Sequence, residues 1–342
     1  MFNLFEKRVD LRIDLDTRCN FKCRYCDNSD LPISSKVSIP INEIVTLFQN
    51  AEKKCWSLFL SCAGEPLLNP QLEQILNSLS INVKTPDVSM VTNGLLLNQA
   101  NRKIILDSSI DRIFVSMDSL SPEIYTSWCG VSTTQFQKVF DSIEAFAEER
   151  LLSKKPPHLI VTAIAMKDTL DGLPEIARWL KKIKASAFNI QWLNHMGHED
   201  LKQQQLSLED PLVLKKVKQV LEEVADILKG SGVLLDYPRT ISKEKIWSVF
   251  QNSKLWRNRF YYFRDAVSKW TASRRHLPCR FVTNTYYLWP DGHLKGCPAD
   301  AIETENIFNG NSSLEKEIVK VEQFFSKKDN TLDACRDCPI NS

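Results

Sequence analysis

The chain has 342 residues, of which 43% are hydrophobic and 25% are charged, and its formal net charge is +2. This composition is typical of a globular protein with a sizeable core, and the balanced charge excludes a general affinity for nucleic acid or for an acidic membrane surface. No apolar run approaches the roughly 18 residues of a membrane span, and the charged N-terminus does not resemble a secretion signal. Ten cysteines without such a signal favour metal or cluster ligation in a reducing compartment. We therefore expect a cytoplasmic protein with neither a nucleic-acid partner nor a membrane partner.

Short β-branched or aliphatic runs alternate with longer stretches of helical periodicity as far as Trp192. This alternation is typical of repeated βα units and a parallel sheet. Helix starts are marked between the runs, for example by Asn69-Pro70. The predicted strands are Val9 to Leu15, Ser57 to Ser61, Asp87 to Thr92, Arg112 to Met117, His158 to Met166 and Ala187 to Trp192. We predict an α/β fold, a partial (β/α)6 TIM-type barrel, with a small C-terminal α+β iron-sulfur domain.

The βα alternation stops after Asn194, and Asp210-Pro211 begins a long amphipathic helix that ends at Gly230. We expect this helix to be the last one packed on the barrel. The next stretch, 241–276, is helical, aromatic and basic. It is either a bridging helix that buries its rings between barrel and tail, or a lid that presents cations to an anionic substrate or partner.

A hairpin is predicted from Asn284 to Gly296, with Asp291-Gly292 at its turn. The sequence thus divides into a barrel over 1–235, a helical bridging segment over 236–276 and a tail domain over 277–342.

The stretch Cys19-Asn20-Phe21-Lys22-Cys23-Arg24-Tyr25-Cys26 follows the first predicted strand and contains a CxxxCxxC triplet. A [4Fe-4S] cube has four irons, so three cysteines on one loop leave one iron open to a ligand that is not protein. The alternative is a zinc site with a distant fourth ligand, although zinc loops usually come as two CxxC-type pairs. The spacing therefore favours a reactive cluster.

This triplet resembles the radical S-adenosylmethionine (radical SAM) superfamily, in which the open iron binds the amino and carboxylate groups of SAM. Tyr25 matches the aromatic residue that precedes the third cysteine in that family. The resemblance implies a SAM-binding [4Fe-4S] cluster on Cys19, Cys23 and Cys26, with SAM itself as cofactor.

Other polar motifs follow the next three predicted strands, at the rim where the loops of a barrel carry its reactive groups. Gly64-Glu65-Pro66 resembles the GGEP-type motif that holds the SAM ammonium, and the alternative for Glu65 is a helix cap. Ser116 and Asp118 match the family position that meets the SAM carboxylate or ribose, with helix capping as the alternative for Asp118. Asn93 ends the third strand in a similar place. We expect all of these residues to bind the cofactor.

Four further cysteines lie in the last quarter of the chain, at Cys279, Cys297, Cys335 and Cys338. Their pattern resembles the SPASM or twitch extension of radical SAM enzymes, which carries auxiliary iron-sulfur clusters. Four thiolates complete one cube and leave no iron open, which favours electron transfer. A zinc site on the same four cysteines is the alternative.

The family resemblance implies that an external electron donor of the flavodoxin or ferredoxin type reduces the first cluster. SAM is then cleaved to methionine and a 5′-deoxyadenosyl radical, which abstracts a hydrogen atom from the substrate. Because the first strand begins near Val9, we expect no N-terminal peptide-recognition domain, which favours oxidation of a small molecule such as a sugar or an aminocyclitol.

Two other functions remain open at this point. One is peptide modification by crosslinking or epimerisation, with Cys129 as the hydrogen-atom donor in epimerisation or, in the alternative, as a buried structural thiol. The other is a non-catalytic electron-transfer protein that binds an iron-sulfur cluster or zinc.

Overall fold

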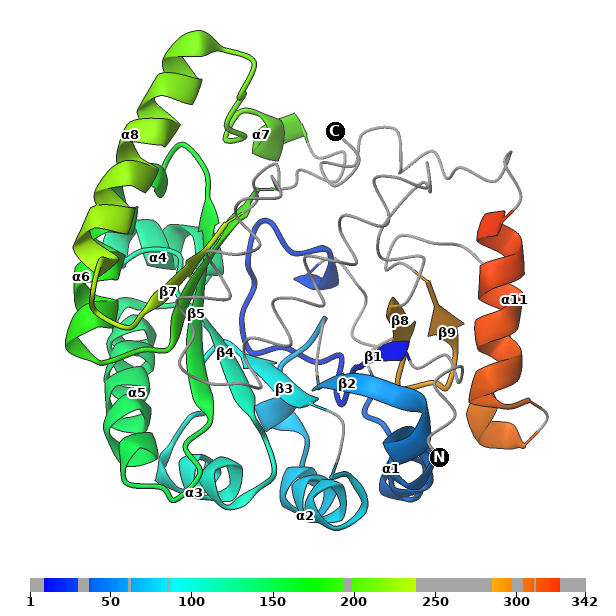
Figure 1. The fold of residues 1–342 in the computed structure, drawn as a ribbon. Helices are drawn as coiled ribbons and strands as arrows, with labels where there is room; N and C mark the ends of the chain where they lie inside the picture. The colour runs from blue at the N-terminus through cyan, green and yellow to red at the C-terminus, as the bar shows by residue number, and fades with distance from the viewer. Residues whose placement is uncertain are drawn as a thin grey trace.

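The structure is a computed structural model that describes residues 9–29, 37–60, 63–84, 87–193, 199–237, 285–296, 304–310 and 312–326. The predicted barrel strands are confirmed, and each end lies within two residues of the prediction. Together they form a curved parallel sheet in chain order (Figure 1). The strands are β1 (Val9–Ile13), β2 (Cys55–Leu60), β3 (Asp87–Thr92), β4 (Arg112–Ser116), β5 (His158–Ala165) and β6 (Ala187–Trp192).

Helices cover the convex face of this sheet, as the βα pattern predicts (Figure 1). They pack on alternate strand residues such as Leu11, Leu58 and Val115, which are fully buried. The helices are α1 (Ile41–Lys54), α2 (Leu72–Asn82), α3 (Gln99–Asp107), α4 (Pro122–Cys129), α5 (Thr133–Leu151) and α6 (Leu173–Lys182). The sheet is open, as a partial barrel requires.

The long amphipathic helix is confirmed as α8 (Pro211–Leu228), which packs on α6 after the short helix α7 (Glu199–Lys202). The Asp210 side chain caps it by accepting a hydrogen bond from the Leu212 amide at 2.8 Å. The expectation that the βα alternation stops after Asn194 is wrong, because β7 (Leu234–Asp236) pairs in parallel with β6 after α8. This strand has three half-buried residues, too few to produce a recognisable pattern.

The predicted hairpin is also confirmed, as β8 (Thr285–Leu288) and β9 (Leu294–Lys295) with Gly292 at φ +88° in the turn. Its position was not foreseen. β8 pairs in parallel with β1, so the sheet order is β7-β6-β5-β4-β3-β2-β1-β8-β9 and the hairpin shares one sheet with the barrel. The following helix α11 (Leu314–Ser326) contacts β9, and Glu315 lies 3.8 Å from Lys54 of α1.

The concave face of the sheet carries many polar side chains. Strand register places Arg12, Phe59, Ser89, Arg112 and His158 in one row across β1 to β5. The Arg12 guanidinium lies 4.9 Å from the centroid of the Phe59 ring and 5.4 Å from that of Tyr287 on β8. The hairpin therefore contributes to the lining of the barrel.

Among the described helices, none is both long enough and apolar enough to cross a membrane. The predicted helix over 241–276 and Cys279, Cys297, Cys335 and Cys338 lie outside the described residues. The boundaries at 235 and 276 stay predictions.

Candidate functional site

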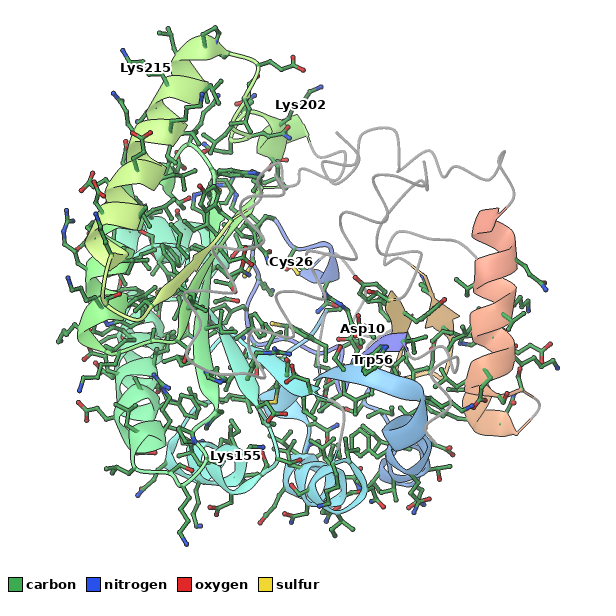
Figure 2. The ribbon with its side chains drawn as sticks, viewed as in Figure 1. Asp10, Cys26, Trp56, Lys155, Lys202 and Lys215 are labelled. Atoms are coloured by element: carbon green, nitrogen blue, oxygen red, sulfur yellow. The ribbon has the colours of Figure 1, made fainter. Side chains whose placement is uncertain are left out.

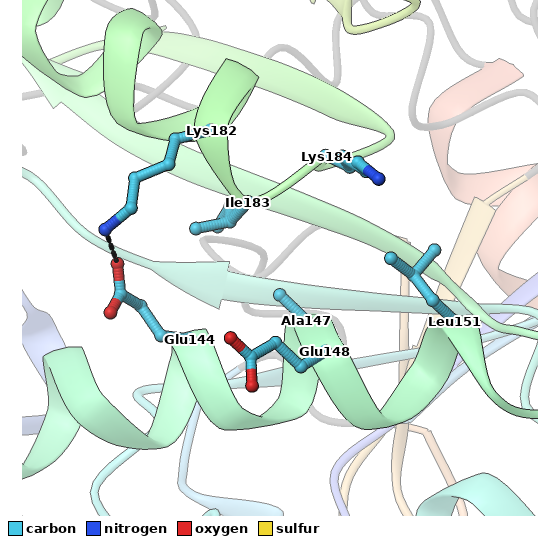
Figure 3. Close-up of a pocket in the computed structure, with 7 residues that line it drawn as sticks. All are labelled: Glu144, Ala147, Glu148, Leu151, Lys182, Ile183 and Lys184. Carbon is cyan, nitrogen blue, oxygen red and sulfur yellow. Dashed lines mark hydrogen bonds and ion pairs between the residues drawn. The ribbon is translucent and has the colours of Figure 1, made fainter.

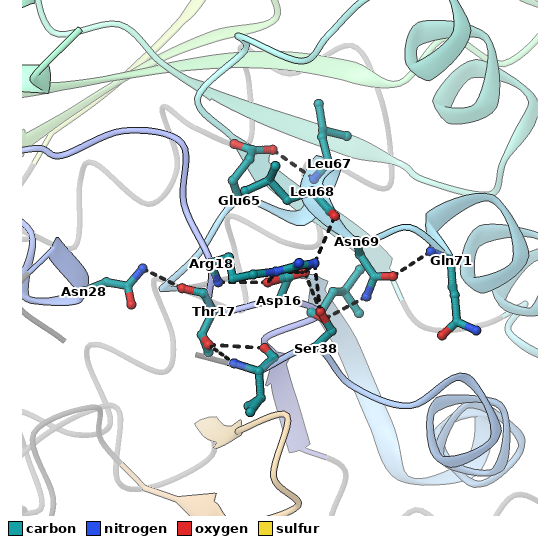
Figure 4. A network of polar contacts seen from close by, with 12 residues as sticks. Asp16, Thr17, Arg18, Asn28, Ser38, Glu65, Leu67, Leu68, Asn69 and Gln71 are labelled. Carbon is teal, nitrogen blue, oxygen red and sulfur yellow. Dashed lines mark hydrogen bonds and ion pairs between the residues drawn. The ribbon is translucent and has the colours of Figure 1, made fainter. Parts of the chain in front are cut away.

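The chain from Asp14 to Ser29 follows β1 and carries the cysteine triplet on the concave side of the sheet, where Figure 2 labels Cys26. A polar network fixes the start of this segment (Figure 4). Arg18 donates to the Asp16 carboxylate through Nε at 2.9 Å and to the Leu68 carbonyl at 3.2 Å. Ser38 donates to the same carboxylate at 2.6 Å. The chain entering the triplet is thus tied to two other loops.

The loop after β2 packs directly against this segment. The Ala63 amide donates to Asp14 Oδ1 at 2.8 Å, and the Glu65 amide donates to the Arg18 carbonyl at 2.8 Å. A Cβ added at Gly64 would lie 2.0 Å from the Asp16 carbonyl oxygen. Gly64 is therefore required here because no side chain fits between the two loops.

The C-terminal end of α4 supports the triplet from the other side. The Lys22 amide donates to the Cys129 carbonyl at 3.2 Å, and the Arg24 amide donates to the Trp128 carbonyl at 2.9 Å. These are carbonyls that a helix end leaves without intrahelical partners. Gly130 ends the helix at φ +65°, where an added Cβ would lie 2.7 Å from the Lys22 carbonyl oxygen. The helix end thus shapes the cysteine loop through backbone contacts.

The three thiols of the triplet are half-buried. The Phe21 amide donates to Cys19 Sγ at 3.5 Å. Burial, together with the negative charges of Glu65, Cys23 and Cys26, raises the pKa of Cys19 to about 11. Three thiolates this close repel one another, so a bound group of positive irons suits the site. Within the part of the chain that the structure describes, no three His, Cys, Asp or Glu side chains are grouped to hold a single metal ion.

Glu65 lies inside the site with only 1% of its surface exposed. Its carboxylate accepts hydrogen bonds from the Leu67 amide at 3.0 Å, from Thr92 Oγ1 at 2.8 Å and from the Asn93 amide at 2.7 Å. Burial raises its pKa to about 7 against the opposing effect of these donors. Glu65 also caps the short helix Pro66–Leu68, so the capping role weighed from the sequence is present.

Asn93 lies beside the triplet, and its predicted role in binding the cofactor stays a prediction. Its Nδ2 lies 3.7 Å from Cys19 Sγ and donates to Asn20 Oδ1 at 2.6 Å. Its Oδ1 accepts from the Leu95 amide at 3.1 Å. Asn93 therefore connects the end of β3 to the cysteine loop.

Tyr25, Asp118 and Cys129 meet on the α4 side of the loop. The Tyr25 hydroxyl donates to Asp118 Oδ2 and lies 3.9 Å from Cys129 Sγ, while Asp118 Oδ1 accepts from the Ile164 amide at 2.8 Å. Asp118 and Cys129 are each 3% exposed. Burial raises the pKa of Asp118, and the neighbouring Cys23 and burial raise the pKa of the Cys129 thiol. Both Asp118 oxygens thus have protein partners, and its predicted contact to SAM stays a prediction.

Ser116 is half-buried at the end of β4, in register with Thr162 of β5. Asn189 of β6 donates to Thr162 Oγ1 at 3.3 Å. These side chains continue the polar lining of the concave face toward the cysteine rim.

Sequence reasoning did not identify two contributors to the site. Trp128 stacks on Tyr25 with ring centroids 6.5 Å apart, and the Arg24 guanidinium lies 4.4 Å from its ring centroid. Asn20 accepts from Asn93 across the loops. The position of Asn20 between two cysteines of the triplet could have marked it as a site residue. Nothing in the sequence connects Trp128 with Tyr25.

A surface hollow among the described residues lies elsewhere. It has a volume of about 250 Å³ and lies between α5 and the end of α6, where Lys182 pairs with Glu144 at 3.1 Å (Figure 3). None of the predicted site residues lines it.

Comparison with known proteins identifies the family. The model of the Radical SAM superfamily matches residues 15–190, just over half of the chain. The chain belongs to the radical SAM superfamily. Members of this superfamily use a [4Fe-4S] cluster and SAM, so these cofactors follow. The matched region includes the cysteine triplet, Glu65, Asn93, Ser116, Asp118 and Cys129.

Among curated relatives of this radical SAM protein are GTP 3′,8-cyclases. The enzyme of Trichormus variabilis is 35% identical over 140 residues, 40% of this chain and 42% of the relative. The enzyme of Microcystis aeruginosa is 31% identical over 140 residues with the same coverage. The matched part of the chain thus spans less than half the length of these relatives.

Solved structures agree on the fold. Streptococcus suis SuiB bound to S-adenosylmethionine superposes with a TM-score of 0.66 at 14% identity, over 98% of this chain and 72% of SuiB. Histidine-tagged anSMEcpe with bound AdoMet gives a TM-score of 0.64 at 16% identity, over 97% of this chain and 83% of that one. At these identities the likeness concerns the fold alone.

Proposed function

We propose that Cys19, Cys23 and Cys26 hold the [4Fe-4S] cluster of this radical SAM enzyme and leave one iron to bind SAM. The observation that supports this assignment is the position of three half-buried thiols on one loop, which is held by hydrogen bonds to the loop after β2 and to the end of α4. In the proposed site the Glu65 carboxylate, buried beside Asn93, places negative charge near the cationic amino group of SAM.

A cluster held by Cys19, Cys23 and Cys26 would supply one electron to bound SAM, and the chemistry it would provide is cleavage of SAM to methionine and a 5′-deoxyadenosyl radical that abstracts a hydrogen atom from a substrate C–H bond. The contribution of this chain is to position both molecules and to exclude water. The proposed reaction chamber is the concave face, because the cysteine loop, Asn93 and Ser116 lie at the C-terminal ends of β1, β3 and β4, where the loops of a barrel carry its reactive groups.

For the substrate we propose a small polar molecule such as a sugar or an aminocyclitol, which loses a hydrogen atom, then a proton and an electron, and is thereby oxidised. The polar side chains that line the concave face support this choice, since hydroxyl-rich molecules need donors and acceptors. Thr162, Asn189, Ser116 and Arg12 contribute to that lining. Cys279, Cys297, Cys335 and Cys338 are proposed to hold the auxiliary [4Fe-4S] cluster that accepts the electron. A flavodoxin or ferredoxin type of protein is the proposed donor to the first cluster.

The test begins with anaerobic reconstitution and an assay for 5′-deoxyadenosine with dithionite and SAM. We expect product from the wild type and none from Cys19→Ala, Cys23→Ala or Cys26→Ala. Cys55→Ala is the matched control, because Cys55 is buried in β2 and belongs to no proposed ligand set. We expect about eight irons and about eight sulfides per chain for two [4Fe-4S] clusters, and about four of each after one of the two clusters is lost. Product formation by the triplet variants would contradict the assignment.

A second candidate substrate is GTP, which the sequence likeness to GTP 3′,8-cyclases supports over the matched 140 residues. Deuterium-labelled candidate substrates distinguish the two classes, since only a true substrate transfers deuterium into 5′-deoxyadenosine. Transfer from labelled GTP and from no sugar or aminocyclitol would overturn the oxidation proposal.

Peptide modification is the remaining alternative, with Cys129 as hydrogen-atom donor in epimerisation. Cys129→Ala would then abolish epimerisation of a peptide and leave 5′-deoxyadenosine formation in place. Retained epimerisation in that variant would remove Cys129 from this role. Its burial beside Tyr25 is what a structural thiol would also display.

A further inference from the structure

Two asparagine side chains form a directed pair beside the cysteine triplet. Asn93 Oδ1 accepts from the Leu95 amide at 3.1 Å, which turns Asn93 Nδ2 toward Asn20 Oδ1 at 2.6 Å. Because the Asn20 oxygen faces a donor, the orientation of the Asn20 amide is also fixed. The pair therefore presents both of its NH2 groups in defined directions.

One of these NH2 groups has no acceptor. Asn20 Nδ2 is closed to solvent, yet it has no hydrogen-bond partner among the described residues. A buried donor without an acceptor costs about 1–3 kcal/mol, and structures rarely leave one unexplained. Asn20 lies between Cys19 and Cys23 in the triplet. The missing acceptor therefore belongs to something that binds at this loop.

The other NH2 group already faces sulfur, since Asn93 Nδ2 lies 3.7 Å from Cys19 Sγ. Sulfur atoms of a cluster accept such hydrogen bonds, and these bonds help to set its reduction potential. Reduction adds negative charge to the cluster, so donors stabilise the reduced form more than the oxidised form.

We propose that Asn20 and Asn93 donate hydrogen bonds to sulfur atoms of the cluster held by Cys19, Cys23 and Cys26, and thereby raise its reduction potential. Asn93 acts in addition as a positioning residue, because it orients the Asn20 amide. This inference rests on the proposed assignment of the cluster to the triplet.

The first experiment measures the midpoint potential of this cluster by redox titration followed by EPR, without SAM. The signal is assigned as the one lost in Cys23→Ala. We expect Asn20→Ala and Asn93→Ala to lower the equilibrium constant for one-electron reduction about tenfold each, which is about 59 mV. The double variant should lower the potential by less than the sum of the two single shifts, because Asn93 acts partly through Asn20.

Asn82→Ala is the matched control, since the Asn82 amide donates to the Ser78 carbonyl within α2, far from the triplet in the fold. We expect it to leave the potential unchanged. Wild-type potentials in Asn20→Ala and Asn93→Ala at full iron content would overturn the proposal. If Cys23→Ala loses no EPR signal, the proposed cluster assignment is contradicted instead, so the two failures are distinguishable.

A second experiment needs no variant and covers the case in which the alanine variants take up no iron. Wild-type protein is produced with asparagine labelled with ¹⁵N at the side-chain amide, and the reduced cluster is examined by pulsed EPR. We expect ¹⁵N coupling without SAM. No coupling, or coupling that arises only after SAM is added, would overturn the proposal, because the acceptor would then not be the cluster.

Discussion

His158 shows how position in the sheet sets the chemistry of a single residue. It begins β5 on the concave face, beside Arg112 in the register. Burial, followed by the positive charges of Arg112 and Arg150, lowers its pKa to about 4. The native state therefore holds this imidazole neutral under conditions in which an exposed histidine gains a proton.

The free energy of unfolding should consequently depend on pH through this residue. Between the usual histidine pKa of about 6.5 and the native pKa of about 4, only the unfolded chain binds the proton, so stability falls as pH falls. We expect about 2 kcal/mol to be lost from pH 7 to pH 5 through this residue. Urea unfolding of the wild type and of His158→Gln at both pH values measures the difference. The same loss in both proteins would contradict this account.

At the residue scale the sequence predicted the members of the site better than their partners. Cys19, Cys23 and Cys26 could be proposed as ligands because metal ligands follow a spacing within one loop. The hydrogen bonds from Tyr25 to Asp118 and from Asn93 to Asn20 join residues 93 and 73 positions apart. Such pairs depend on how strands are placed, which spacing does not encode.

The junction of α4 with the cysteine loop is the main feature at the scale of elements. Gly130 and Gly230 both have positive φ, at +65° and +71°. Only Gly130 meets another segment there, since a Cβ at Gly230 would have no atom within 4 Å. A side chain at Gly230 would therefore introduce backbone strain alone, whereas a side chain at Gly130 would introduce the same strain and a clash with the cysteine loop.

Replacing each glycine by alanine tests this junction. We expect Gly230→Ala to cost about 1–2 kcal/mol of unfolding free energy, which is the strain of left-handed backbone. Gly130→Ala should cost more and should also lower the iron bound per chain, because its Cβ would displace the Lys22 carbonyl from α4. Iron analysis after reconstitution and urea unfolding measure both effects. Equal iron content in the two variants would show that this junction does not shape the loop.

The strands of the barrel were predictable because each is a β-branched or aliphatic run of five or more residues, and in β1 buried and half-buried residues also alternate. β7 was not predictable, because three half-buried residues form no pattern. The sequence also predicted the β8–β9 hairpin but not its pairing with β1. Pairing between distant strands depends on which edge of the sheet is open, and this is a property of the assembled fold.

At the scale of the whole molecule, that pairing makes the tail part of the barrel sheet. Tyr286 of β8 is fully buried and lies in register with Leu11 of β1. If the sheet unfolds as one unit, a destabilising substitution in β8 should also destabilise strands far from β8.

We therefore expect Tyr286→Ala to cost about 3–5 kcal/mol and to speed amide hydrogen exchange across β1 to β6. Ile81→Ala serves as control, because Ile81 is 73% exposed on α2 and its truncation removes little packing. Faster exchange confined to β8 and β9 would indicate that the predicted tail domain over 277–342 folds independently of the barrel.

The contacts around the cysteine loop have a consequence for assembly of the enzyme in the cell. The loop is shaped by backbone hydrogen bonds to α4 and to the loop after β2, and none of these bonds requires iron. Small zinc domains, by contrast, fold only when the metal binds. We therefore expect this chain to fold before it receives its cluster, and we expect a molecule that has lost its cluster to oxygen to regain it by cluster delivery alone, without refolding.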